Sequence, residues 1–349
     1  MDIRSSEKID SFKHQIAAAI DSSYLTEYYC EAGYIEQPLP ILKFASQNQF
    51  STVFDLASLS KALATAPLLF WTKEKNLLSF DDEVGFFLPE LPEEYKKAKI
   101  SELLSHTSGY PAWLNFWINL LPGSVVNEAP SKRQHIIEVL RRSYHRFLFE
   151  QGTCYSDVGY IVLGCILETI FSGTLDKTLY DYCSAKNFSL ESELSYTPLK
   201  PDISAQTAPT GYCMIREKEL RAEVHDENCA VLSGVSGHCG LFGTGEALAS
   251  FIKNLWSEQN SYFSQDLSQQ GGYSLGLRLG DDASSEVFGQ GRSLGHLGFT
   301  GTAFWVDVPS KRYAIFLTNR VISGRISPEI KTLRRNFFSM CQKEFSRRR

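Results

Sequence analysis

The sequence predicts a mixed α/β (α+β) fold in which helices flank one antiparallel sheet built from both ends of the chain. Strand-like runs occur near the N-terminus and again in the last quarter, whereas the middle of the chain has helical character. The 349 residues are enough for a large core and an inserted domain. We therefore expect a sheet domain, 1–80 and 231–349, interrupted by an all-helical domain, 81–230.

The elements follow from hydrophobic periodicity and from breaker residues. The first part predicts a helix over 6–21, strands near 26–35 and 50–54, and a helix from Ser58 to about Lys73, kinked at Pro67. The middle predicts helical segments at 100–104, 136–140, 158–170 and 175–185. After a glycine-rich stretch, the pattern predicts a helix over 245–257, strands at 273–279, 301–308 and 313–317, and a closing helix over 327–345.

Composition narrows the classes of partner. Hydrophobic residues make up 43% and charged residues 21%, as in a globular protein. The net charge of -5 argues against a nucleic-acid partner, and no run approaches the roughly 20 apolar residues of a membrane span. With no visible signal peptide and eight cysteines lacking a C-x-x-C pair, we expect a cytoplasmic protein, or a periplasmic one if an export signal has been removed.

Ser58 and Lys61 are the first candidates for chemistry. Residues three apart share a helix face, so the hydroxyl and the amine can meet. A lysine amine held neutral can take the proton of a serine and activate it as a nucleophile, and a helix start favours the negative charge that develops. The same Ser-x-x-Lys spacing occurs at Ser5–Lys8 and Ser250–Lys253, but only Ser58 follows an apolar run and opens a helix of small residues.

Two further patches could complete a site around Ser58. Tyr155 precedes a predicted helix and could relay a proton, with Asp157 as a polar contact; a packed tyrosine ring and an aspartate N-cap are the alternative. His296 precedes Gly298 and a strand, so a backbone N–H there could form an oxyanion hole with the N–H of Ser58.

Other nucleophiles and a metal site are weaker alternatives. His225, Asp226 and Glu227, with His238, have the residue types of a zinc site, but their spacing does not match His-Glu-x-x-His. Cys154 and Cys239 have no activating group nearby in the sequence. The spacing therefore does not predict a metal site.

Taken in order, the three patches resemble the serine β-lactamase and penicillin-binding-protein superfamily, in particular its class C β-lactamase-like hydrolases and esterases. Ser58–Lys61 matches the family's Ser-x-x-Lys, Tyr155–Asp157 resembles Tyr-x-Asn, and His296–Gly298 resembles Lys- or His-Thr-Gly. Segments 103–109 and 224–242 also read like the family, so the resemblance spans about 50–320.

The resemblance implies roles for these residues. Ser58 would attack a carbonyl to form an acyl-enzyme, with Lys61 or Tyr155 as the base and His296 tuning the network. The N–H groups of Ser58 and Phe299 would hold the oxyanion, and water would then hydrolyse the ester. The acyl-enzyme chemistry implied by the resemblance needs neither a metal nor an organic cofactor.

Two departures bear on the substrate. Asp157 replaces the family's asparagine and lacks its N–H donors, and Leu297, beside Gly298, replaces a threonine that contacts the substrate carboxylate. Both changes weaken recognition of β-lactams and of D-alanyl-D-alanine termini. We therefore expect a serine hydrolase acting on a small-molecule ester, amide or peptide. A penicillin-binding-type D,D-carboxypeptidase or β-lactamase, a non-catalytic protein on the same fold and a zinc hydrolase are the alternatives.

Overall fold

The computed structural model describes residues 3–117, 131–143, 152–188, 194–196, 204–257, 272–280, 288, 293–326 and 328–348. Its α-helices are α1 (Ile3–Asp21), α2 (Ala66–Glu74), α3 (Val84–Phe87), α4 (Glu93–Lys96), α5 (Ile100–Leu104), α6 (Lys132–Ser143), α7 (Asp157–Phe171), α8 (Leu175–Ala185), α10 (Glu227–Val231), α11 (Gly245–Leu255) and α12 (Glu329–Arg347). Its strands are β1 (Tyr28–Tyr34), β2 (Leu42–Ala45), β3 (Val53–Asp55), β4 (Leu194–Tyr196), β5 (Gly211–Cys213), β6 (Lys218–Leu220), β7 (Leu241–Thr244), β8 (Tyr273–Ser274), β9 (Leu277–Leu279), β10 (Ser293–Leu297), β11 (Ala303–Asp307) and β12 (Arg312–Thr318).

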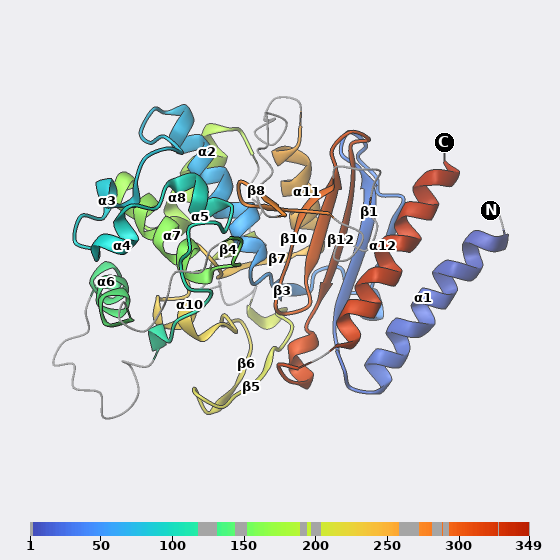
Figure 1. Cartoon of the computed structure of the whole chain (residues 1–349). Coiled ribbons are helices and arrows are strands. Elements are labelled where there is room, and N and C mark those ends of the chain that lie inside the picture. Colours follow the sequence, from blue (N-terminus) through green and yellow to red (C-terminus); the bar gives the residue numbers. More distant parts are fainter. Residues whose placement is uncertain are drawn as a thin grey trace.

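The main sheet joins both ends of the chain, as the sequence predicts. Seven strands run in the order β2-β1-β12-β11-β10-β9-β8, and every pair is antiparallel. The first strand, β1, pairs along its whole length with the last, β12, with Cys30 opposite Phe316. In Figure 1 this sheet stands beside a largely helical region.

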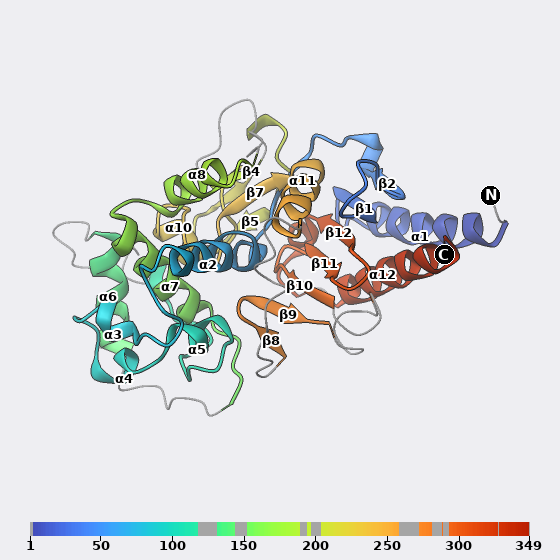
Figure 2. The ribbon, with the colours of Figure 1, turned by 90° about the horizontal axis from the view of Figure 1, so that it is seen from above.

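Alternating side chains explain why both faces of the sheet are covered. On β12, Ala314 and Phe316 join one hydrophobic cluster with α1 and α12, whereas Tyr313, Ile315 and Leu317 join the other cluster with α11 and the helical region. Successive side chains of a strand point to opposite faces, so a strand buried on both sides is apolar throughout. Figure 1 shows α1 and α12 packed side by side on the outer face. Figure 2 shows α11 on the opposite face.

The prediction that the region 81–230 is all-helical is wrong, because this region also contains the strands β4, β5 and β6. β4 and β3 pair with opposite edges of β7 in a small three-stranded sheet, and β5 pairs with β6 in a hairpin. These strands are only three or four residues long, too short for alternation to distinguish them from loops. The small sheet bears on the candidate site because β3 ends at Asp55, three residues before Ser58.

Two expected elements differ in detail. The strand predicted over 273–279 is the hairpin β8–β9, because Leu275 and Gly276 turn the chain with φ values of 38° and 99°. The helix after Ser58 is π-helical over Lys61–Thr65 and becomes α-helical at Ala66. Pro67 therefore lies in the first turn of α2, where its missing N–H is tolerated.

No single helix within the described ranges is long and apolar enough to cross a membrane. The pair α7 and α8 passes the same test of length and composition only when taken together, and it is bent by 67°.

The contact between α11 and β1 gives a test of packing. A Cβ added at Gly245 would lie 2.1 Å from Cδ1 of Tyr29, a buried ring in β1. We expect Gly245→Ala to lower the free energy of unfolding by about 1–3 kcal/mol, as overpacking does in cores. Gly173→Ala is the control, because the nearest atom to its Cβ would be 3.7 Å away. Urea denaturation of both variants measures the difference, and equal midpoints would contradict this packing.

Candidate active site

Ser58 follows β3 in a backbone conformation that the surrounding structure enforces. The preceding residue, Ala57, has a φ of 49°, a left-handed value that costs roughly 1–3 kcal/mol for a non-glycine residue. Its N–H donates to Asp55 Oδ1 at 2.8 Å, and Asp55 Oδ2 accepts from the N–H of His225 at 2.7 Å. Burial raises the pKa of Asp55 to about 6 despite these hydrogen bonds. Asp55 thus fixes the turn that presents Ser58.

Lys61 is completely buried beneath Ser58, and polar groups surround its ammonium. Its Nζ donates to Ser58 Oγ at 3.0 Å and to the carbonyl of His238 at 3.0 Å, and it lies 2.6 Å from Asp157 Oδ1 in an ion pair. Burial acts to lower the pKa of Lys61, but Asp157 and Tyr155 outweigh it and raise that pKa above its ordinary value. Lys61 is therefore an ammonium in the resting site.

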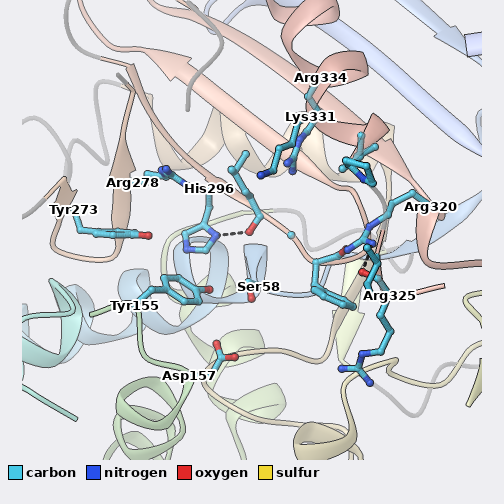
Figure 3. A pocket seen from close by; sticks show the side chains of 16 residues that line it. Ser58, Tyr155, Asp157, Tyr273, Arg278, His296, Arg320, Arg325, Lys331 and Arg334 are labelled. Atoms are coloured by element: carbon cyan, nitrogen blue, oxygen red, sulfur yellow. Dashed lines mark hydrogen bonds between the residues drawn. The ribbon is translucent and has the colours of Figure 1, made fainter. Parts of the chain in front are cut away.

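Tyr155 shares the same polar network. Burial is the main cause that raises the pKa of its phenol to about 12, while Lys61 opposes the rise and a hydrogen bond with Ser58 favours the phenolate. The Lys61 ammonium lies 5.0 Å from the centre of the Tyr155 ring. In Figure 3 the hydroxyl end of Tyr155 is directed at Ser58.

His106 holds the segment that carries Tyr155. Its Nδ1 accepts from the N–H of Ser156 at 3.0 Å, and its carbonyl accepts from the N–H of Cys154 at 2.9 Å. Burial lowers the pKa of His106 well below its usual range, so the ring is neutral. Ser156 is the N-cap of α7 and accepts from Gly159 at 2.9 Å. The alternative that Asp157 caps this helix is therefore wrong; its carboxylate faces Lys61.

His296 lies on β10 beside Tyr155, with the two ring centres 6.0 Å apart. Its Nδ1 is 2.8 Å from the carbonyl of Leu297, so this nitrogen carries the proton (Figure 3). Burial, with a smaller contribution from Lys61, lowers the pKa of His296 to about 3. The ring is consequently neutral, and its buried Nε2 is a lone-pair acceptor with no partner among the described residues.

The N–H groups of Ser58 and Phe299 are available for an incoming ligand. Within the part of the chain that the structure describes, neither donates to a protein acceptor. Thr300 Oγ1 donates to the carbonyl of Asp55 at 2.7 Å, and Thr302 Oγ1 donates to that of Leu56 at 3.2 Å. These bonds tie the turn that carries Phe299 to the strand that carries Ser58, and so fix the two N–H groups relative to each other.

Gly298 is required at its position in this turn. A Cβ there would lie 1.9 Å from Thr302 Oγ1 and 2.9 Å from the carbonyl oxygen of Leu56. The glycine predicted from the motif is thus explained by close approach of two backbone segments.

A cavity of about 710 Å³ opens above Ser58, and its walls are strongly basic. Its only carboxylate among the described residues is Asp157, already paired with Lys61. Leu297 also lines it. In Figure 3 cationic side chains approach Ser58 from β9, from the segment after β12 and from α12; they are Arg278, Arg320, Arg325, Lys331 and Arg334.

The competing sequence patterns are not assembled in the same way. Lys253, of the Ser250 match, donates to the carbonyls of Gln37 and Pro38 at 3.0 and 3.2 Å, on the α11 side of the sheet. The side chain of Ser5 lies outside the described residues. Of the two matches whose side chains the structure describes, the Ser58 match is the one that meets a tyrosine and a histidine in a cavity.

The proposed metal ligands form a different network. His238 Nε2 is 3.0 Å from Asp226 Oδ1, and its Nδ1 is 2.9 Å from Ser236 Oγ. Glu227 is paired with Arg325. Among the described residues, no three His, Cys, Asp or Glu side chains converge as a metal site. A hydrogen bond with Cys229 and burial raise the pKa of Cys239, which disfavours its thiolate.

Comparisons with known proteins settle the family. The Beta-lactamase family model matches residues 45–336, most of the chain. The chain belongs to the beta-lactamase family. An N-acetylmuramyl-L-alanine amidase of Bacillus subtilis (strain 168) is 30% identical over 329 residues, covering 83% of this chain and 73% of the relative. An Escherichia coli (strain K12) protein, provisionally named a D-alanyl-D-alanine carboxypeptidase, is 26% identical, covering 80% and 71%.

A class C beta-lactamase from Rhodobacter sphaeroides confirms the fold. Its TM-score is 0.69 at 14% identity, and the alignment covers 97% of this chain and 99% of the other. The predicted α/β fold and the predicted class of enzyme, a serine hydrolase of the beta-lactamase family, are both confirmed.

Several residues of this beta-lactamase-family site escaped sequence reasoning. Asp55 and Thr300 act on backbone groups, and the carbonyl of His238 acts on Lys61, contacts that leave no spacing signature. The basic residues come from segments that the motifs do not include. The one sequence feature that could have indicated a basic cavity is the cluster of arginines and lysines over 320–334.

Asp157 gives the site a testable pH dependence. Its carboxylate acts to raise the pKa of both Lys61 and Tyr155. A base acts when deprotonated, so activity rises with pH through its pKa; Asp157→Asn should lower both pKa values and move that rise to lower pH. The pH profile of kcat/KM for a p-nitrophenyl ester measures the shift. If the rise of kcat/KM with pH stays at the same pH in Asp157→Asn, or moves to higher pH, the effect of Asp157 on these two pKa values is contradicted.

Proposed function

We propose that this protein is a serine hydrolase in which Ser58 forms an acyl-enzyme with an ester or a small amide or peptide. The observation that carries the proposal is the buried Lys61 ammonium, 3.0 Å from Ser58 Oγ and paired with Asp157. An exposed helix start would have neither the burial nor the second partner. The names of the sequence relatives, an amidase and a carboxypeptidase, support hydrolysis of amides.

The acylation step starts from the phenolate form of Tyr155, which is the minor form because the pKa of the phenol is raised to about 12. Ser58 Oγ attacks the substrate carbonyl carbon as its proton passes to this phenolate. The Lys61 ammonium, held by Asp157 and the carbonyl of His238, stabilises the phenolate. The N–H groups of Ser58 and Phe299 donate to the tetrahedral oxyanion. When the carbon–leaving-group bond breaks, Tyr155 returns the proton to the leaving group.

Deacylation repeats the sequence with water as the nucleophile. Water gives its proton to Tyr155, attacks the acyl carbon and releases the acid, and Ser58 recovers its proton. The ring of His296, 6.0 Å from that of Tyr155, is a neutral acceptor at Nε2, which has no partner among the described residues. Its part is to orient Tyr155 or the water without adding a second positive charge beside Lys61.

A D,D-carboxypeptidase is the second candidate, and the basic cavity favours it. The sequence suggests weak recognition of a carboxylate, because Asp157 and Leu297 replace the usual donors. The cavity instead offers cations from β9, α12 and the segment between β12 and α12, such as Arg278, Lys331 and Arg334. A substrate with a terminal carboxylate would be attracted to it, since charged walls around a cleft concentrate ions of opposite sign.

The assignment of Ser58 is tested by a burst experiment. With a p-nitrophenyl ester we expect a burst of p-nitrophenol and an acyl adduct on Ser58 in the intact mass. Ser58→Ala should lower the burst rate by about a thousandfold or more, because no other serine or threonine hydroxyl among the described residues is bonded to Lys61. Ser250→Ala is the control, because it alters the Ser-x-x-Lys match at Ser250–Lys253 and leaves Ser58 in place. An undiminished burst in Ser58→Ala would refute the proposal.

The basic cavity is tested by charge reversal. Lys331→Glu should lower the preference for a peptide with a free C-terminal carboxylate over the same peptide with a C-terminal amide, by about tenfold at low salt. The preference is the ratio of the two kcat/KM values. Lys97→Glu, an exposed site in the helical region, is the control. Equal ratios in Lys331→Glu and wild type would show that Lys331 does not select the substrate.

A further inference from the structure

A second, smaller cavity of about 230 Å³ also reaches Ser58. It shares Ser58, Asp157, Phe299 and Arg325 with the basic cavity but extends toward the loop at 225–239. The ring of Phe299 is part of the wall between the two cavities. His225 stacks on it with ring centres 5.9 Å apart, while the guanidinium of Arg320 lies 4.5 Å from the ring centre.

Most of the charged groups around the second cavity are already satisfied. The two oxygens of Asp55 accept backbone N–H groups, and Asp157 faces the Lys61 ammonium. The guanidinium of Arg325 is paired with Glu227, whose side chain is 7% exposed. None of these groups therefore offers a free charge to a ligand.

Asp226 is paired with His238 through Oδ1 at 3.0 Å, so it is not an isolated charge. Asp226 and His225 nonetheless keep polar atoms that have no partner among the described residues. Asp226 uses Oδ1 for the N–H of Cys229 and for His238, whereas its Oδ2 has no partner among the described residues and the side chain is 24% exposed. His225 is only 8% exposed, yet neither ring nitrogen has a partner within the described residues. A buried polar side chain without a partner is costly, so an unsatisfied imidazole in a cavity wall indicates a missing ligand.

The protonation states of this pair favour a cation. Burial opposes ionisation of Asp226, but His238 and backbone hydrogen bonding lower the pKa of the carboxyl to about 2. Burial lowers the pKa of His225 to about 4, which leaves a neutral ring. An ionised oxygen and a neutral imidazole lone pair both accept hydrogen bonds, as an ammonium requires.

The remaining walls are aromatic. Trp113, with 42% of its surface exposed, and Phe299 both line the cavity. Cations are attracted to the quadrupole of an aromatic face, most strongly to that of indole. The Phe299 ring already has His225 stacked on it, and the guanidinium groups of Arg320 and Arg325 lie 4.5 and 5.3 Å from its centre. Trp113 is therefore the ring that can take a further cation. A carboxylate, an imidazole acceptor and an indole around a small cavity form a binding environment for an organic ammonium.

We propose that the second cavity is an ammonium subsite and that the substrates are zwitterionic amides, such as short peptides with both termini free. The inference rests on the proposed function, because it places the scissile carbonyl at Ser58 between the two cavities. The ammonium lies with Asp226, His225 and Trp113, and the carboxylate lies in the basic cavity beyond Phe299.

Binding is tested first in a protein that cannot turn over substrate. Calorimetric titration of Ser58→Ala with n-propylammonium chloride at constant ionic strength should show saturable binding, and 1-propanol should show none. Asp226→Asn added to Ser58→Ala should weaken the ammonium about tenfold or more, since hydrogen bonds to charged groups are the strong ones. Glu219→Gln, at an exposed carboxylate on β6, is the control and should bind as Ser58→Ala does.

A second variant covers the case in which Asp226→Asn fails to fold, because Asp226 also caps α10. His225→Phe retains the stacking on Phe299 but removes both ring nitrogens, and it should weaken n-propylammonium binding as well. Equal binding of propanol and propylammonium, or binding unchanged in every foldable variant of these two residues, would overturn the subsite.

The substrate class is tested by competition in the active protein. Alanylalanine should inhibit the p-nitrophenyl ester burst at a concentration about tenfold lower than N-acetyl-alanylalanine, which lacks the ammonium. The L,L and D,D forms are both used. Equal or stronger inhibition by the acetylated peptides would overturn the inference. Failure of the Ser58 chemistry itself would appear differently, as a missing burst with intact ammonium binding in Ser58→Ala.

Discussion

The rest of the active site is arranged around one buried positive charge, the ammonium of Lys61. A charge removed from water is costly unless hydrogen bonds and an opposite charge replace the lost solvation. Ser58 Oγ, the carbonyl of His238 and Asp157 supply that replacement, and they come from three separate stretches of the chain. The same interaction that stabilises Lys61 thus brings the sheet, α7 and the loop at 236–240 together around Ser58.

Rigid positioning of backbone groups is the second feature of the site. Ala57 is held in a left-handed conformation by Asp55, and Thr300 and Thr302 anchor the turn of Phe299 to the carbonyls before Ser58. These are local hydrogen bonds within packed elements, so the two N–H groups need little reorganisation when charge develops. Positioning groups of this kind touch no substrate, yet the geometry of the nucleophile depends on them.

Electrostatic asymmetry across Ser58 is the third feature. The chain as a whole has a net charge of -5, but the larger cavity is lined by five cations. In the smaller cavity Asp226 is paired with His238 through Oδ1, and its Oδ2 has no partner among the described residues. Phe299 lines both cavities, with His225 stacked on its ring and Arg320 4.5 Å from the ring centre. A difference in charge between the two cavities would orient a substrate as well as attract it.

The sequence by itself determined the fold class, the pairing of both chain ends in one sheet and the set Ser58, Lys61, Tyr155 and His296 that the structure brings together. Hydrophobic alternation and motif order carry that information locally. Tertiary structure alone decided that Lys61 faces Asp157, that β10 and the small β3-β7-β4 sheet form, and that basic side chains of β9 and α12 surround the cavity. Those contacts join residues up to hundreds of positions apart, and their burial sets the pKa values. The spacing of a motif predicts neither the distance between two side chains in space nor their burial.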